Sequence, residues 1–179
     1  MLERALARRA GLGFLGKNGM MIHPTYGSYL FLGEILTDLP LEVGQGEIPD
    51  GCGGCTLCLK ECPTAAFVAP RVLDAGRCIS TWTVEVRGEL PPSAPRLHGH
   101  LFGCDRCQEV CPYNREAPLS AEPDFQPRPE WFAPAPAAVL ALTGPELEAR
   151  LSGSGLRRAG EAGLRRSALR ILEEEISEA

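Results

Sequence analysis

The chain has 179 residues, 44 % of them apolar, and a formal net charge of −5. This length can bury one or two cores, and the apolar content excludes a largely disordered chain. No stretch approaches the roughly 18 apolar residues of a membrane-spanning helix, and the charged start has no apolar signal core. We therefore expect a cytoplasmic protein, in which cysteines are more often metal ligands or catalysts than disulfides.

The start of the chain predicts one helix and a group of strands. Residues 2–10 predict the helix, which Gly11 is placed to end. The segment 14–41 is apolar and interrupted by glycines, which predicts two or three strands. One of them, Tyr29–Leu36, is apolar enough to be buried on both faces.

The rest of the chain alternates between linkers and denser segments. Residues 42–50 are rich in glycine and acid and predict a linker, and the prolines of the segment before the tail predict an extended tether. Helices are predicted over 137–142, 145–151 and 155–176. The predicted domains are a first segment, a cysteine-rich module, a tether and a helical tail, at residues 1–45, 46–116, 117–136 and 137–179.

Eight cysteines form two runs and one isolated position. The runs are Cys52, Cys55, Cys58 and Cys62, followed by Pro63, and Cys104, Cys107 and Cys111, followed by Pro112; Cys78 stands alone. Three cysteines separated by two residues each can wrap three corners of a [4Fe–4S] cube, and the cysteine before proline ligates the other cluster in two-cluster ferredoxins. Proline in that place also fits the first position of a helix.

The second run is one cysteine short of this pattern, and Cys78 is the only cysteine left to fill the vacancy. Cluster one is therefore assigned to Cys52, Cys55, Cys58 and Cys111, and cluster two to Cys62, Cys78, Cys104 and Cys107. Two zinc sites would not need three cysteines at this spacing followed by Cys-Pro. Four disulfides are disfavoured in the cytoplasm.

Five segments closely resemble epoxyqueuosine reductase: AGLGFLGKN, YGSYLFLGEILTDLPL, CGGCTLCLKECPTAAFVAP, LDAGRCIS and LFGCDRCQEVCPYNR. The resemblance implies an oxidoreductase that uses cobalamin and two [4Fe–4S] clusters to reduce epoxyqueuosine to queuosine at the wobble position of tRNA. It implies an α+β fold with a remnant of the cobalamin-binding domain, a ferredoxin-like module and a C-terminal α-helical, HEAT-like tail. The implied partners are the tRNA anticodon loop and an external electron donor, and we expect a monomer.

In this family the proton-donating Asp lies a few residues before the segment that matches Leu2–Leu6, which is upstream of Met1 here. We therefore expect an incomplete form of the enzyme with little or no activity by itself. Two alternatives stay open: a stand-alone two-cluster electron carrier, without affinity for cobalamin or tRNA, and a relative of the reductive dehalogenases, which also pair cobalamin with two clusters.

The resemblance also implies binding residues outside the cysteines. Eight residues are expected near the corrin ring: Lys17, Asn18, Met21, Ser28, Tyr29, Leu32, Ser80 and Asp105. The apolar members would equally suit a core β-turn, and Ser80 and Asp105 would equally suit caps of a helix or turn.

Candidate contacts to tRNA phosphates are five arginines, namely Arg87, Arg157, Arg158, Arg165 and Arg166. An arginine-rich stripe suits phosphate contact. The negative net charge argues weakly against a nucleic-acid partner, and the same arginines would suit the solvated face of a helix.

Overall fold

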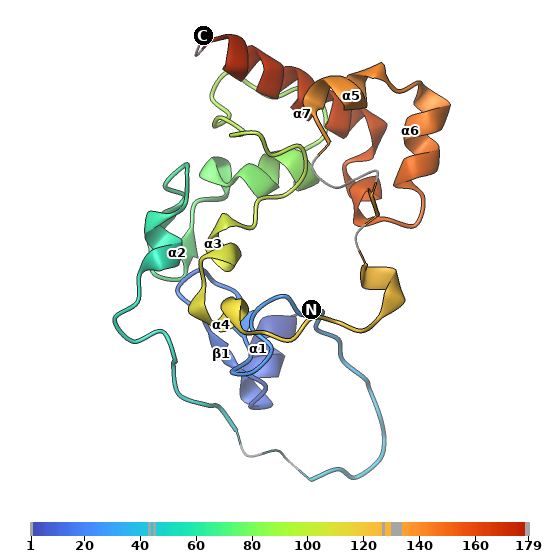
Figure 1. Cartoon of the computed structure of the whole chain (residues 1–179). Helices are drawn as coiled ribbons and strands as arrows, with labels where there is room; N and C mark the ends of the chain where they lie inside the picture. The colour runs from blue at the N-terminus through green and yellow to red at the C-terminus, as the bar shows by residue number, and fades with distance from the viewer. Residues whose placement is uncertain (1, 43, 45, 127, 130–133, 178–179) are drawn as a thin grey trace. The chain divides into compact units, whose positions relative to one another are not determined.

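The computed structural model of the chain (Figure 1) describes residues 2–42, 44, 46–126, 128–129 and 134–177. It divides into two compact units, each built from two stretches of chain. Unit 1 comprises Met1–Leu73 and Asp105–Leu119, and unit 2 comprises Asp74–Cys104 and Ser120–Ala179. The predicted boundaries of four consecutive domains stay predictions. Within the described ranges, no helix combines the length and apolar character that crossing a membrane requires.

Unit 1 begins with the predicted helix and a short hairpin. Helix α1 spans Glu3–Arg9, and Gly11 follows it with a φ of +73°, a left-handed conformation that favours glycine at a helix end. Strand β1 (Phe14–Leu15) pairs antiparallel with β2 (Met21–Ile22), with Phe14 opposite Ile22. The helix and two of the predicted strands are thereby confirmed.

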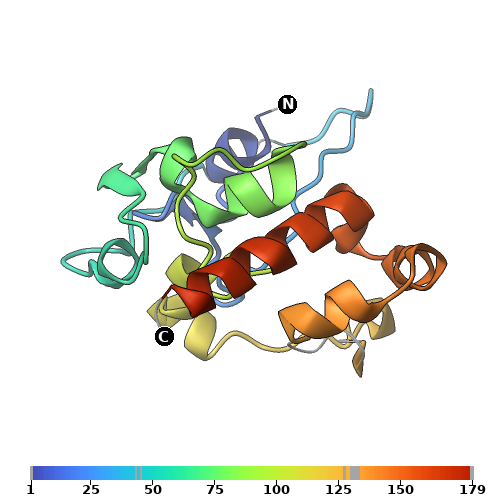
Figure 2. The same ribbon diagram turned by 90° about the horizontal axis from the view of Figure 1, so that it is seen from above.

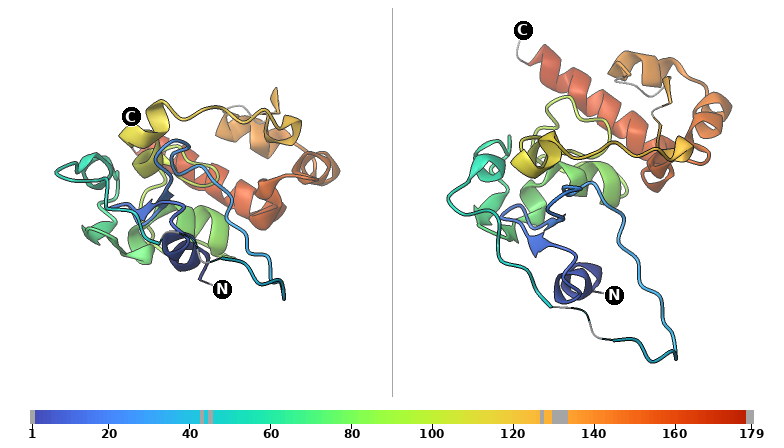
Figure 3. Two further views of the ribbon diagram at one scale, coloured as in Figure 1. Left: turned by 90° about the horizontal axis from the view of Figure 1, so that it is seen from below. Right: turned by 60° about the horizontal axis from the view of Figure 1, so that its bottom comes forward.

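The predicted buried strand over Tyr29–Leu36 is wrong. These residues form no regular element, and residues 30–42 run as an open loop (Figure 3, right). Phe31 is 89 % exposed, and Ile35 and Leu36 are each 92 % exposed. An apolar run becomes a buried strand only where a neighbouring strand supplies the ladder, and the sheets of the described residues pair other segments.

The cysteine runs of unit 1 lie on short helices and turns. These elements are α2 (Leu57–Lys60), β3 (Phe67–Ala69), β4 (Val72–Leu73), α3 (Arg106–Glu109) and α4 (Pro112–Arg115). Pro112 is the first residue of α4, with Cys111 as its N-cap, as predicted. Pro63 instead begins a turn, in which Ala65 has a φ of +48°, so a helix start after Cys62 is wrong.

Unit 2 is mainly helical. Its elements are η1 (Ala75–Arg77), η2 (Thr81–Glu85), η3 (Pro123–Phe125), α5 (Pro136–Ala141), α6 (Gly144–Leu151), η5 (Gly155–Arg158) and α7 (Gly160–Ile176). Figure 2 shows α7 running beside α5, and one apolar core joins these two helices to α6. The predicted helices over 137–142 and 145–151 are confirmed. The predicted helix over 155–176 is interrupted at Gly160, whose φ is +68°.

A buried carboxylate in α7 fixes the loop that leads to Cys104. Glu174 is 7 % exposed and accepts hydrogen bonds from the backbone N–H of Leu97, at 2.8 and 3.0 Å, and of His98, at 3.2 Å. Arg170 donates to the same carboxylate at 3.2 Å. Because a buried carboxylate needs such donors, this network holds a loop that has no regular structure of its own.

Candidate iron–sulfur centres

Four cysteines from both runs enclose one cavity in unit 1. Its volume is about 260 Å³, and its lining includes Cys52, Cys55, Cys58 and Cys111. No group of three or more His, Cys, Asp or Glu side chains in the described part of the chain is close enough to hold a single metal ion. The four thiols line this cavity and come from both runs, as ligands of one cluster do in two-cluster ferredoxins. The structure thus brings together the residues predicted for cluster one.

Lys17 closes the loop of the first cysteine run. Its ammonium donates to the backbone oxygens of Gly53 at 2.7 Å and Cys55 at 2.8 Å. Its backbone N–H donates to the sulfur of Cys52 at 3.4 Å. One residue thus supplies a positive charge and an N–H···S hydrogen bond to this loop, and both favour a thiolate.

Asn18 connects β1–β2 to the second cysteine run. Its side chain is buried, donates to the backbone oxygen of Cys107 at 3.1 Å and accepts from the N–H of Met20 at 3.1 Å. An unpaired buried amide is costly, so these two hydrogen bonds hold Asn18 and helix α3 in one arrangement.

Asp50 and Arg71 support the first run from outside, and neither was predicted. The N–H of Cys52 donates to the Asp50 carboxylate at 2.9 Å, and Arg71 forms an ion pair with the same group. The backbone N–H of Cys52 and then the Arg71 guanidinium hold the pKa of Asp50 below its usual range. The position of an Asp two residues before a cysteine is an Asx-turn signal that would have identified Asp50.

A side-chain network fixes the second run against the segment after β2. The N–H of Ser28 donates to the Asn114 side-chain oxygen at 2.7 Å, and the Ser28 hydroxyl donates to the Gln108 side-chain oxygen at 2.9 Å. Gln108 in turn donates to the Asp105 carboxylate at 2.7 Å. Gln108 and Asn114 were not predicted, because their partner Ser28 lies about 80 residues away in the chain.

Burial raises the pKa of the Cys52 and Cys58 thiols. Without compensation these thiols would stay protonated, and a thiol must lose its proton to bind iron. A bound cation inverts this preference, because metal coordination deprotonates a thiol outright. Buried thiols of this kind are therefore suited to act as ligands, because a metal cluster deprotonates them on binding. They are not suited to act as free thiolate nucleophiles.

The four cysteines predicted for cluster two are divided between the units. Cys62 and Cys107 belong to unit 1, and Cys78 and Cys104 belong to unit 2. Within unit 1 the N–H of Ala66 donates to the Cys62 sulfur at 3.3 Å. Neither unit by itself contains this predicted ligand set, so it stays a prediction.

Comparison with known proteins shows which proteins the chain resembles. Residues 51–114 match the model of a 4Fe-4S double cluster binding domain. The chain is 46 % identical over 161 residues to the epoxyqueuosine reductase of Pseudomonas aeruginosa, across 89 % of this chain. A solved selenomethionine-labelled epoxyqueuosine reductase matches 95 % of this chain with a TM-score of 0.86 and 40 % identity. Over most of its length, this chain is a homologue of epoxyqueuosine reductases.

The matches cover only part of each relative. The chain spans 45 % of the Pseudomonas aeruginosa epoxyqueuosine reductase and 45 % of the selenomethionine-labelled one. An epoxyqueuosine reductase solved with a tRNA-Tyr epoxyqueuosine-modified stem loop also matches, with a TM-score of 0.85 and 40 % identity over 95 % of this chain and 45 % of that one.

Of the residues that resemblance to epoxyqueuosine reductases places near cobalamin, most are engaged in the fold. Lys17 and Asn18 make the hydrogen bonds described above, Met21 and Ser28 are buried, and the Ser80 hydroxyl donates to the backbone oxygen of Cys104 at 3.4 Å. Tyr29, Leu32 and Asp105 keep exposed surface. Burial, followed by the charges of Asp105 and Glu109, raises the pKa of Tyr29 to about 12, so its phenol stays protonated at neutral pH.

The predicted tRNA-contacting arginines fall into two groups. Arg165 donates to the backbone oxygens of Leu140 at 3.1 Å and Leu142 at 2.6 Å, and Arg166 donates to those of Trp82, Val86 and Gly88. The terminal nitrogens of both guanidiniums therefore donate inside unit 2, whereas the buried Nε of Arg166 has no hydrogen-bond partner among the described residues. Arg87, Arg157 and Arg158 are exposed, and Arg158 forms an ion pair with Glu85 at 2.7 Å.

Proposed function

We propose that this chain provides the electron-transfer part of an epoxyqueuosine reductase, in which two [4Fe–4S] clusters serve the reduction of epoxyqueuosine to queuosine on tRNA. The observation that carries the proposal is the cavity enclosed by Cys52, Cys55, Cys58 and Cys111, in a homologue of epoxyqueuosine reductases. When bound, such clusters supply single electrons at low potential.

For cluster one we propose the four cysteines of the cavity as ligands. They belong to both runs, as the crosswise pattern of two-cluster ferredoxins requires. Lys17 holds the Cys52–Cys55 loop through its two carbonyl contacts, and its charge and N–H partly offset the negative charge of the thiolates. Net charge and hydrogen bonds to sulfur set cluster potentials, so Lys17 is a residue that raises the potential of this cluster.

For cluster two we propose Cys62, Cys78, Cys104 and Cys107. Two observations support this assignment: the spacing of the cysteine motif, and the presence of eight cysteines, which is four ligands for each of two clusters. The Ala66 N–H···S contact to Cys62 at 3.3 Å would stabilise a thiolate there.

The proposal that cobalamin takes part is supported by the resemblance to epoxyqueuosine reductases. The described residues do not fit a corrin site by themselves, because six of the eight expected residues are buried or hydrogen-bonded in the fold. Asp105 is among the six, since it accepts from Gln108, but its side chain remains exposed. We keep Tyr29, Leu32 and Asp105 as candidate contacts and derive no reaction step from them. Tyr29, with its raised pKa of about 12, would serve as a hydrogen-bond donor and not as a base.

For tRNA we propose Arg87, Arg157 and Arg158 as the phosphate contacts, because their side chains are exposed. Arg165 and Arg166 are assigned to the internal structure of unit 2. A tRNA substrate also fits the predicted cytoplasmic location.

The experiment is a binding assay with the anaerobically reconstituted full chain. Fluorescence anisotropy is measured with a tRNA-Tyr stem loop that carries epoxyqueuosine and with the unmodified stem loop. We expect binding of the modified RNA, weakened in the Arg157→Gln/Arg158→Gln double variant but not in the Arg115→Gln control, which removes a similarly exposed charge. Clusters that can be reduced reversibly in a chain without affinity for either RNA would contradict the proposal and favour a stand-alone electron carrier.

A further inference from the structure

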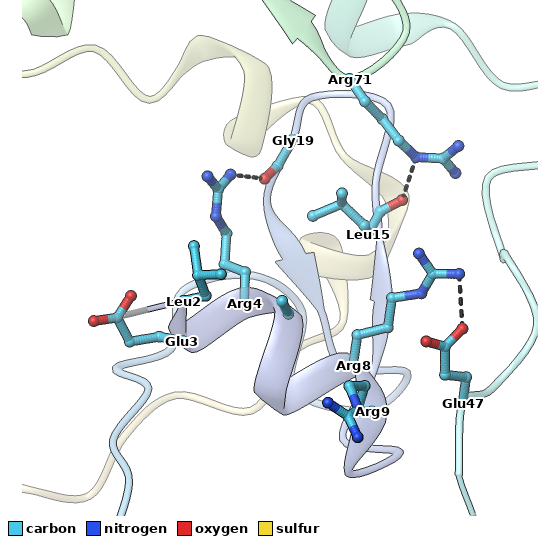
Figure 4. Close-up of a pocket in the computed structure, with 10 residues that line it drawn as sticks. Leu2, Glu3, Arg4, Arg8, Arg9, Leu15, Gly19, Glu47 and Arg71 are labelled. Atoms are coloured by element: carbon cyan, nitrogen blue, oxygen red, sulfur yellow. Dashed lines mark hydrogen bonds and ion pairs between the residues drawn. The ribbon is translucent and has the colours of Figure 1, made fainter.

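A basic pocket in unit 1 lies outside the cysteine cavity and is unassigned. Its volume is about 430 Å³, and three arginines of α1, Arg4, Arg8 and Arg9, line it together with Arg71 from the β3–β4 turn (Figure 4). We propose that this pocket binds phosphate groups, and that these belong to an RNA backbone. The choice of RNA rests on the proposed function, whereas the choice of phosphate rests on the pocket itself.

The charge of the pocket is opposite to that of the chain. Its lining contains four arginines against two carboxylates, those of Glu3 and Glu47, whereas the chain has a net charge of −5. A concave surface lined by one sign of charge concentrates ligands of the opposite sign. The planar guanidinium fork also matches the oxygens of a phosphate in two parallel hydrogen bonds.

The present partner of Arg8 is exchangeable. Arg8 pairs with Glu47 at 2.8 Å, and the two side chains are 49 % and 46 % exposed. Figure 4 shows the guanidiniums of Arg8 and Arg71 on the same side of the view as Glu47. Ion pairs this exposed contribute little stability, so a phosphate can take the place of the Glu47 carboxylate at Arg8. Glu47 is therefore a competitor of the ligand.

Two of the four arginines are held in position by the backbone. Arg4 donates to the oxygen of Gly19, and Arg71 donates through its Nε to the oxygen of Leu15 at 2.9 Å. Arg71 also forms an ion pair with Asp50 through a terminal nitrogen. Because a guanidinium has five N–H donors, each of these two arginines still has N–H groups for a ligand. Leu15 and Leu2 add an apolar wall, which suits the sugar or base that accompanies a nucleic-acid phosphate.

The test uses two substitutions that should act in opposite directions. Affinity for a fluorescent tRNA-Tyr stem loop is measured for the reconstituted full chain at several salt concentrations. Arg8→Gln should weaken binding about threefold and lower the salt dependence by about one phosphate contact, and Glu47→Gln should tighten binding about threefold. The matched controls lie outside the pocket: Arg115→Gln removes one positive charge and Glu42→Gln removes one negative charge. Both should change the affinity for RNA less than the pocket variants do.

The outcomes separate this inference from the proposed function. If Arg8→Gln and Glu47→Gln behave like their controls while Arg157→Gln/Arg158→Gln still weakens RNA binding, the pocket is not a phosphate site and the proposed function stands. If the chain binds no RNA, calorimetry with inorganic pyrophosphate decides the matter. Pyrophosphate binding with the same opposite responses would support the site with a free phosphate as its ligand, and no binding would overturn it.

Discussion

Arg166 provides a direct test of whether the arginines of α7 serve the fold or the RNA. We consider Arg166→Met, which keeps most of the apolar stem and removes the guanidinium. That group donates to the backbone oxygens of Trp82 at 2.6 Å, Val86 at 3.0 Å and Gly88 at 2.6 Å. It thereby holds η2 and the residues after it against α7.

The expected cost follows from these contacts. The bonds to Trp82 and Val86 are partly buried, and a hydrogen bond from a charged donor contributes about 1.5 kcal/mol or more. The bond to Gly88 is exposed, so water replaces it at little cost. Burial, and then the charge of Arg87, already lowers the pKa of Arg166, so part of the gain is offset by desolvation. After this offset, we expect Arg166→Met to lower the free energy of unfolding by about 2 kcal/mol.

The assay is equilibrium urea denaturation followed by far-UV circular dichroism, with Arg157→Met as the matched control. Arg157 is exposed, so its replacement should change the free energy of unfolding by no more than about 0.5 kcal/mol. The reasoning is refuted if the two variants unfold alike, or if Arg166→Met is as stable as the unsubstituted chain but binds RNA more weakly.

Three further predictions concern the core, a cap and the cluster-one loop. Leu164→Ala, at a site 1 % exposed, should cost about 3 kcal/mol in urea denaturation, and Leu169→Ala, at a site 53 % exposed, should cost little. Hydrogen bonds from the Thr143 backbone and side chain lower the pKa of Glu146. The Glu146 carboxylate therefore stabilises the fold at neutral pH, and this stabilisation is lost as pH falls through the lowered pKa. Thr143→Ala should raise the pKa of Glu146 in a carboxyl NMR titration, and an unchanged value would refute the cap. Lys17→Met should lower the midpoint potential of one cluster in an EPR redox titration, and two unchanged potentials would contradict its placement.

The sequence could predict how the first cysteine run wraps because that geometry is local. Spacing within Cys52–Cys58 determines how tightly the loop can wrap, and the proline after Cys111 specifies a helix start. What spacing could not predict is the support around them. Asn114 holds Ser28 across 86 residues of chain, and no local pattern indicates such a partner.

The errors of the sequence prediction have a common cause, because an apolar or charged pattern does not say what covers it. Tyr29–Leu36 has the composition of a buried strand but runs as an open loop. The helical period placed Arg165 and Arg166 on one helix correctly. It could not reveal that the backbone at 82–88 and 140–142 accepts their hydrogen bonds, because those contacts depend on tertiary structure.

The central claim is that eight cysteines of this chain hold two [4Fe–4S] clusters. Its most direct test is iron and sulfide analysis of the anaerobically reconstituted chain, combined with EPR of the reduced protein. We predict about eight irons and eight sulfides per chain, and about four of each in Cys78→Ala, which should lose cluster two and keep cluster one. About four irons in the unsubstituted chain, or a full complement in Cys78→Ala, would contradict the account.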